Sequence, residues 1–159
     1  MVRDATVADH PAVLSLNNAA EPHVNALPQH EFDWLVAHAA YFRLLEDAGG
    51  LAGFVLCLSS GIDYWSGNYQ WFTERYTTFL YLDRVVVAPR ARGSGVGRAL
   101  YEDLHAFAEG KWERVMLEVN LRPPNPGSDA FHEKLGYVVV GTREYEAGER
   151  AVRLFERQM

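Results

Sequence analysis

Residues 85–100 read V-V-V-A-P-R-A-R-G-S-G-V-G-R-A-L, and this stretch decides how the chain is expected to fold. A β-branched run ends at Pro89, a turn rich in arginine and glycine follows, and an apolar helical pattern begins at Val96. The stretch therefore predicts a strand, a turn and a helix in that order. Because the first N–H groups of a helix have no partner within it, the helix start is a predicted anion site, flanked by Arg90, Arg92 and Arg98.

Length and composition are typical of one globular domain. The chain has 159 residues, of which 48% are hydrophobic and 23% charged, and we expect residues 1–159 to form a single domain. A net charge of −6 argues against a nucleic-acid partner, which would require a basic surface. A local group of arginines on an acidic protein favours a small anionic ligand instead.

Other features exclude several classes of protein. The single cysteine, Cys57, allows no intrachain disulfide and is expected to be a buried thiol. The first residues do not resemble a signal peptide and no apolar run has the length of a membrane span, so we expect a cytoplasmic protein with no membrane contact. The six histidines lack the spacing of a metal site, and no metal is expected.

The remaining pattern predicts a mixed α/β fold with the element order βααβββαβαββ. The predicted strands are residues 2–6, 41–46, 51–59, 79–87, 114–120, 137–142 and 151–155. The first predicted helix ends near residue 18, and the others are residues 30–40, 96–107 and 128–135. Ser128 is the predicted N-cap of the last helix.

The segment 60–78 has two open interpretations. It carries six aromatic residues among glycine, serine and asparagine, and it reads as a loop or short helix: Tyr64, Trp65, Tyr69, Trp71, Phe72 and Tyr76. Such a segment forms either a local core or the wall of a substrate site, because aromatic side chains supply large buried areas in both.

The spacing of the glycines distinguishes this turn from common nucleotide motifs. Glycines at alternate positions 93, 95 and 97 fit neither a P-loop nor the G-x-G-x-x-G dinucleotide pattern. Arg92-Gly93-Ser94-Gly95-Val96-Gly97 instead resembles the [QR]-x-x-G-x-[GA] motif of the GNAT N-acetyltransferase superfamily. A second segment contains Asn125, Ser128 and then Phe131-His132-Glu133-Lys134-Leu135-Gly136-Tyr137, and it is similar to the family's N-x-x-A-x-x-[FL]-Y-E-K-x-G-F. The resemblance is strongest over residues 79–140.

This resemblance implies a fold and an activity. The fold is a single α/β (α+β) domain with a mixed central sheet of about six to seven strands flanked by about four helices. The activity is transfer of an acetyl group from acetyl-CoA to a primary amine of a small molecule or peptide, by direct attack in a ternary complex. The alternative is a non-catalytic module of the same fold that binds CoA or acyl-CoA. Homodimers are frequent in the family.

The resemblance also implies a binding site for acetyl-CoA. Backbone amides from Arg92 through Arg98 would hold the pyrophosphate, the end of the preceding strand would pair with the pantetheine arm, and Asn125 would contact that arm. The residues that the family motifs assign to this site are Val85, Val86, Val87, Arg92, Gly93, Ser94, Gly95, Val96, Gly97, Arg98, Asn125, Ser128, Phe131 and His132.

Four residues are the catalytic candidates. The N–H of Val87 would polarise the thioester carbonyl. His132 stands where family members commonly have a tyrosine that protonates the departing thiolate. An amine must lose a proton before it attacks, and Glu118 is the first candidate base and Asp83 the second. Either carboxylate is alternatively a solvated or ion-paired strand residue. The acceptor side of the family fold would include the polar connection with Glu21, His23 and Asn25.

Overall fold

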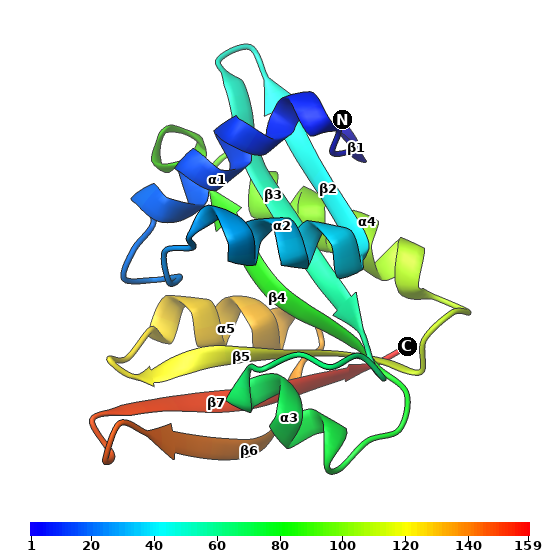
Figure 1. The fold of residues 1–159 in the computed structure, drawn as a ribbon, viewed down its shortest axis with the longest axis vertical. Coiled ribbons are helices and arrows are strands. Elements are labelled where there is room, and N and C mark those ends of the chain that lie inside the picture. Colours follow the sequence, from blue (N-terminus) through cyan, green and yellow to red (C-terminus); the bar gives the residue numbers. More distant parts are fainter. The chain divides into compact units, whose positions relative to one another are not determined.

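The computed structural model describes residues 1–159, and its strands form one seven-stranded sheet in the order β1-β2-β3-β4-β5-β7-β6 (Figure 1). The pair β4–β5 is parallel, whereas β1–β2, β2–β3, β5–β7 and β6–β7 are antiparallel. The strands are β1 Val2–Asp4, β2 Ala39–Asp47, β3 Gly50–Ser59, β4 Leu80–Val87, β5 Arg114–Arg122, β6 Val138–Tyr145 and β7 Arg150–Gln158. The expected mixed sheet of six to seven strands is confirmed.

Five α-helices accompany the sheet, one more than expected. They are α1 His10–Ala19, α2 Gln29–His38, α3 Gly67–Thr73, α4 Val96–Ala108 and α5 Pro126–Lys134, with two short 3-10 helices, η1 Val7–Asp9 and η2 Pro89–Ala91. The additional helix, α3, lies in the aromatic segment that the sequence left open as a loop or short helix. Its N-cap residue is Ser66, whose hydroxyl accepts a hydrogen bond from the N–H of Tyr69.

The chain packs as two compact units. Unit 1 consists of Met1–Leu58 and Leu82–Phe107, and unit 2 of Ser59–Tyr81 and Ala108–Met159. Strand β4 contributes its first two residues to unit 2 and its remainder to unit 1.

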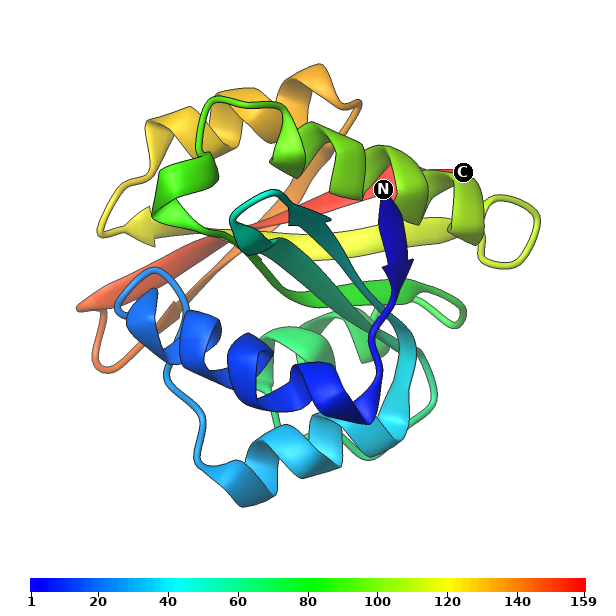
Figure 2. The same cartoon turned by 90° about the horizontal axis from the view of Figure 1, so that it is seen from above.

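In unit 1, α1 and α2 lie on one face of the β2–β3 hairpin and α4 lies on the other (Figure 2). Because both faces are covered, β3 is buried along most of its length, which explains its continuous apolar sequence. The α1–α2 side is filled by the rings of His10, Phe32, Phe42 and Phe54.

A glycine in β3 allows α4 to lie close to the strands. A Cβ atom at Gly53 would lie 2.9 Å from the carbonyl oxygen of Val86, 3.1 Å from Cδ1 of Leu100 and 3.2 Å from Cγ1 of Val96. Any side chain at this position would therefore push the first turns of α4 away from β3 and β4. Gly53 fixes the position of the helix start.

In unit 2, α3 and α5 lie on opposite faces of the sheet (Figure 2). The ring of His132 in α5 lies 6.0 Å from that of Phe155 in β7, which is paired with Leu117 of β5. Side chains alternate along a strand, so Glu118, the neighbour of Leu117, faces α3. The alternation predicted for β5 is confirmed.

Candidate functional site

The segment between β4 and α4 forms a turn that exposes backbone N–H groups. Gly95 caps α4, since its carbonyl accepts from the N–H of Ala99 at 3.0 Å, and the amides of Val96, Gly97 and Arg98 therefore start the helix. Gly93 and Gly95 have φ values of +78° and +87°, a left-handed conformation that glycine adopts without strain. The predicted strand-turn-helix order is confirmed.

The surroundings of this turn fit an anionic ligand. No atom lies within 4 Å of the position that a Cβ would take at Gly93 or Gly95, and residues 92–95 are all exposed. The first turn of α4 contains no acidic residue, so nothing there opposes a negative charge. Accessible amides at a helix N-terminus are the arrangement that binds phosphate groups.

The three nearby arginines do not all belong to this turn. Arg92 is exposed beside it, and Arg98 forms an exposed ion pair with Glu102 at 3.0 Å. Arg90 was predicted at the same place, but its guanidinium binds Asp47 at 2.8 Å and the carbonyl of Leu51 at 2.9 Å. The carboxylate in the β2–β3 turn therefore holds the side chain of Arg90.

Asp83 and Arg84 form a buried ion pair on β4 of unit 1. The Nε atom of Arg84 lies 2.8 Å from Oδ2 of Asp83, and the side chains are only 5% and 4% exposed. The same guanidinium donates to Oδ1 of Asn17 at 3.1 Å and to the carbonyl of Asn25 at 3.3 Å. Asp83 is therefore part of a structural network that joins β4 to the α1–α2 connection.

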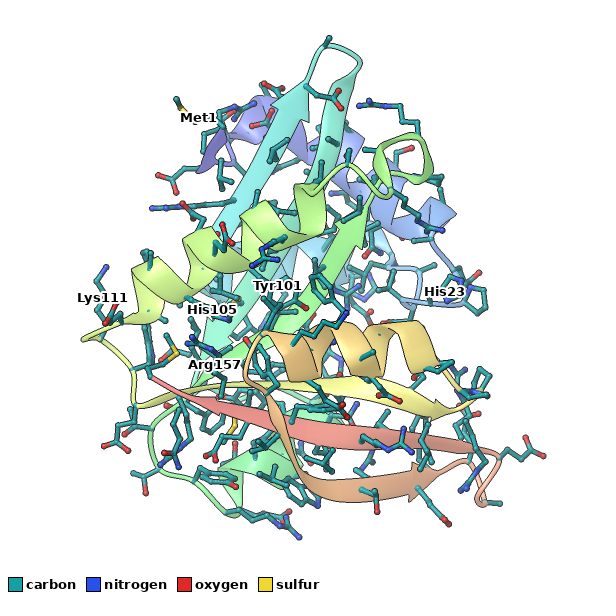
Figure 3. The ribbon with its side chains drawn as sticks, turned by 180° about the vertical axis from the view of Figure 1, so that it is seen from behind. Met1, His23, Tyr101, His105, Lys111 and Arg157 are labelled. Carbon is teal, nitrogen blue, oxygen red and sulfur yellow. The ribbon has the colours of Figure 1, made fainter.

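That connection is also held to α1 by amide side chains. Asn18 accepts from the N–H of Leu27 at 2.8 Å and donates to its carbonyl at 3.2 Å, and Asn17 donates to the carbonyl of Asn25. His23, labelled in Figure 3, is in the exposed part of this connection. Of the three polar residues predicted here, Asn25 is the one bound by Arg84.

Glu118 lies in a polar cluster of unit 2. The hydroxyl of Tyr81 donates to the carboxylate, with both oxygens 2.7 Å away, and Nδ2 of Asn68 donates to Oε1 at 3.2 Å. Asn68 in turn accepts from Arg143 at 3.0 Å. Tyr81 is paired with Met116, two residues before Glu118, in the short parallel ladder between β4 and β5.

The start of α5 differs in detail from the prediction. Asn125, not Ser128, is the cap residue: its side chain accepts from the N–H of Ser128 at 3.4 Å, and Pro126 occupies the first turn. A proline is favoured in the first turn because its missing N–H would have no partner there. At the other end, Arg157 of β7, labelled in Figure 3, donates to the carbonyl of Leu135 at 2.9 Å.

His132 is buried on α5 with a defined tautomer. Its Nδ1 atom lies 2.7 Å from the carbonyl oxygen of Ser128, which can only accept, so Nδ1 carries the proton of the neutral ring. Burial lowers the pKa of His132 from its usual value, and the ring is neutral at pH 7. The neutral ring therefore has a lone pair, not a proton, on Nε2. This tautomer argues against an acid role for His132 at neutral pH.

The aromatic segment forms a local core. Tyr64, Tyr69 and Phe72 are buried, and Tyr69 and Phe72 pack against Tyr81 with ring centroids 5.5 and 5.9 Å away. Trp65 is the exception, with 51% of its surface exposed. Of the two interpretations, the local core describes this segment.

The predicted residues thus fall into two groups. Unit 1 contains Val85, Val86, Val87, Asp83 and the turn from Arg92 to Arg98, and unit 2 contains Glu118, Asn125, Ser128, Phe131 and His132. The sequence missed the partners of the candidate carboxylates, Tyr81 and Asn68 for Glu118 and Arg84 for Asp83. Arg84 adjoins Asp83 and could have been suspected from the opposite charges of the two residues.

Two other kinds of site are not found in the structure. No group of three or more histidine, cysteine or acidic side chains is arranged to hold a metal ion. None of the helices combines the length and the apolar character needed to cross a membrane.

Comparison with known proteins identifies the family. The model of the acetyltransferase (GNAT) family matches residues 9–137, which is most of the chain. No curated protein matches the sequence.

Solved structures with the same fold include three acetyltransferases of low sequence identity. The ribosomal-protein-S18-alanine N-acetyltransferase of Escherichia coli has a TM-score of 0.76 at 18% identity, over 99% of this chain and 92% of that one. The ribosomal-protein-alanine N-acetyltransferase of Brucella melitensis has a TM-score of 0.75 at 22% identity, over 100% of this chain and 99% of that one. A GCN5-related N-acetyltransferase of Kribbella flavida has a TM-score of 0.72 at 20% identity, over 100% of this chain and 97% of that one. The fold and the family model agree, and the chain belongs to the acetyltransferase (GNAT) family.

Proposed function

We propose that this protein transfers an acetyl group from acetyl-CoA to a primary amine, and that residues 1–159 are one acetyltransferase domain. The observation that carries the proposal is the start of α4, where two left-handed glycines expose helix-starting amides with no acidic residue in the first turn. Acetyl-CoA is the acyl donor typical of the family, and its phosphates match this turn in charge.

The donor would be held mainly by backbone groups of the segment between β4 and α4. The amides from Arg92 to Arg98 would bind the pyrophosphate, and Val85, Val86 and Val87 would pair with the pantetheine arm. Asn125 would contribute less than the family motif implies, because its side-chain oxygen already caps α5. The family motif also assigns Ser128, Phe131 and His132 of α5 to the donor.

The reaction forms an amide bond between the amine nitrogen and the acetyl carbon, and it breaks the thioester C–S bond. We assign Glu118 as the base that takes the proton from the attacking nitrogen. The sulfur leaves as a thiolate and takes its proton from solvent. Asp83 is the weaker candidate for the base, because its carboxylate is bound to the buried guanidinium of Arg84. The N–H of Val87 would stabilise negative charge on the carbonyl oxygen.

His132 has a positioning role in this proposal. A thiolate with a pKa near 8.5 is a tolerable leaving group without a general acid. The Nδ1–H group of His132 ties the ring to the first turn of α5 through Ser128, and its neutral state leaves no proton on Nε2 for the thiolate.

The test is an assay of CoA thiol release with a panel of amines, in which the mass of each product is measured. Peptide amines belong in the panel because two structures of similar fold are ribosomal-protein alanine N-acetyltransferases. We expect thiol release that depends on the amine and a product that gains one acetyl group. In Glu118→Gln, kcat should fall by about 10²-fold or more, while the affinity for acetyl-CoA stays unchanged.

The alternative, a non-catalytic module that binds CoA, predicts a different outcome. It predicts tight acetyl-CoA binding and no amine-dependent thiol release with any member of the panel. The observation that favours it is that Asp83 and His132 are both engaged in structural contacts.

A further inference from the structure

Two arginines of unit 2 stand out because no carboxylate neutralises them. Most arginines of this acidic chain form ion pairs, and the exceptions are Arg92, Arg143, Arg150 and Arg157. Arg92 lies at the proposed phosphate site, and Arg157 holds the end of α5. Apart from the hydrogen bond of Arg143 to Asn68, Arg143 and Arg150 on the β6–β7 hairpin have no role in the fold or mechanism described so far.

Arg143 and Arg150 lie together on one face of the hairpin. The register pairs Tyr145 with Arg150, and the guanidinium carbons of Arg143 and Arg150 lie 5.3 and 5.9 Å from the centre of the Tyr145 ring. The Nε atom of Arg150 is buried without a hydrogen-bond partner. Glu146 and Glu149 in the adjoining turn are exposed and form no ion pair with either arginine. Two guanidinium groups around one ring, with an unused buried donor, leave capacity for an anionic ligand.

This face is also the face of Glu118. Across the three strands, Glu118 of β5 is paired with Leu154 of β7, which is paired with Gly141 of β6. Two residues further along each strand, the paired residues on the same face end at Arg143 of β6. Asn68 connects the two charges, since it donates to Glu118 at 3.2 Å and accepts from Arg143 at 3.0 Å. A Cβ atom at Gly67 would collide with the guanidinium of Arg143, so glycine makes room for this arrangement at the start of α3.

We propose that the amine acceptor carries a carboxylate, which Arg143 and Arg150 bind while the amine lies at Glu118. The proposal rests on the proposed function and names the class of its acceptor. Glu118 attracts an ammonium group, and the guanidinium pair attracts a carboxylate through a bidentate geometry that lysine could not offer. A single amide side chain separates Glu118 from Arg143, so the amine and carboxylate of the acceptor lie a few bonds apart. Free amino acids and peptides with an acidic residue next to the N-terminus both have this chemistry.

The experiment compares acceptors that differ only in their negative charge. One arm uses free L-amino acids and their amides, and the other uses short peptides with glutamate or glutamine at the second position. Each arm measures kcat/KM for the wild type, Arg143→Gln and Arg150→Gln. Arg75→Gln is the matched control, because it removes one positive charge from an exposed arginine of the same unit. Binding of each acceptor to the CoA-loaded protein is measured in parallel by saturation-transfer NMR.

We expect the wild type to prefer the charged member of one arm, and that arm identifies the source of the carboxylate. In Arg143→Gln and Arg150→Gln the ratio of kcat/KM for charged over neutral acceptors should fall about tenfold or more, and Arg75→Gln should retain it. Equal ratios in the wild type and both variants would overturn the proposal. Charge-selective binding that the two variants lose, without turnover, would support this site while refuting the proposed catalysis. Absence of charge-selective binding and turnover in both arms would refute the site.

Discussion

At the scale of single residues, the hydrogen bond from His132 to Ser128 changes the expected chemistry. The family motif suggested an acid at position 132, but Nδ1–H donates to a backbone carbonyl and burial lowers the pKa of the ring. The tautomer could not be predicted from the sequence, because it depends on which carbonyl lies beside Nδ1. The sequence motif marks position 132 as a site of interest, and the hydrogen bond to Ser128 places the ring proton of His132 on Nδ1.

Two substitutions of His132 separate positioning from acid catalysis. In His132→Asn the side-chain N–H can replace Nδ1–H, whereas in His132→Gln it is displaced by one carbon. We therefore expect His132→Asn to retain kcat within about threefold and His132→Gln to lose more than tenfold. The measurement is kcat as a function of pH for both variants. Equal large losses in both, with a changed alkaline limb, would instead identify His132 as the acid.

His132 also predicts a pH dependence of stability. In the folded protein the pKa of His132 is lower than the usual value of 6.5, which the unfolded chain retains. Between the folded pKa and pH 6.5, the unfolded chain therefore binds the proton more readily than the folded protein does. The contribution of His132 to stability is thus complete above pH 6.5, and it is lost as the pH falls towards the pKa of His132 in the folded protein. Urea unfolding at pH 7.5 and pH 5.5 should show a larger loss of free energy for the wild type than for His132→Asn. An equal loss in both proteins would show that His132 does not contribute.

The single cysteine gives a test of burial. Cys57 is completely buried, and its pKa is raised well above the usual value by burial and by the charge of Asp83. We expect a thiol reagent such as DTNB to label it only at the rate of unfolding, and to label it rapidly in urea. Rapid labelling of the native protein would show that β3 is accessible.

At the scale of elements, the Asp83–Arg84 pair ties strand β4 to the α1–α2 connection. Arg84→Met would leave the buried Asp83 carboxylate without this guanidinium, and we expect a loss of about 3–5 kcal/mol of unfolding free energy. The control is Arg90→Met, which removes the guanidinium from an exposed ion pair with Asp47 and should cost about 1 kcal/mol or less. Urea denaturation measures both. Similar small effects would mean that the buried network does not hold the connection.

The sequence predicted the types of the elements better than their ends. Alternation in β5 and the apolar spacing of α4 are local patterns, and both elements were found within a few residues of their bounds. The cap of α5 was misplaced because Asn125 and Ser128 are both good cap residues, and Pro126 decides between them. Helix α3 was left open because its apolar residues serve a local aromatic core rather than a long amphipathic face.

At the scale of the whole molecule, the sequence predicted the glycine-rich turn before α4 and missed the networks around the carboxylates. The turn is one continuous segment, so its glycines and helix start are visible in the sequence. Glu118 meets Asn68 and Tyr81 only through strand register and the docking of α3, which depend on contacts between distant segments. The candidate site is therefore predictable where it is local and unpredictable where tertiary contacts assemble it.

Binding of a multiply charged donor to a protein of net charge −6 must depend on local geometry. In the proposed function the turn before α4 would provide that geometry, with Gly95 at its centre. Gly61 offers a matched comparison, because it has the same φ of +87° and an equally open Cβ position in a loop that no part of the donor site includes.

The proposed donor site is tested most directly by a calorimetric titration of acetyl-CoA into the wild type, Gly95→Val and Gly61→Val. Both variants should lose a similar amount of stability, about 1–2 kcal/mol, from the left-handed backbone. We expect the wild type and Gly61→Val to bind acetyl-CoA with similar affinity, and Gly95→Val to bind it at least about tenfold more weakly. Equal affinity in Gly95→Val and Gly61→Val, or no binding by the wild type, would contradict the proposed donor site.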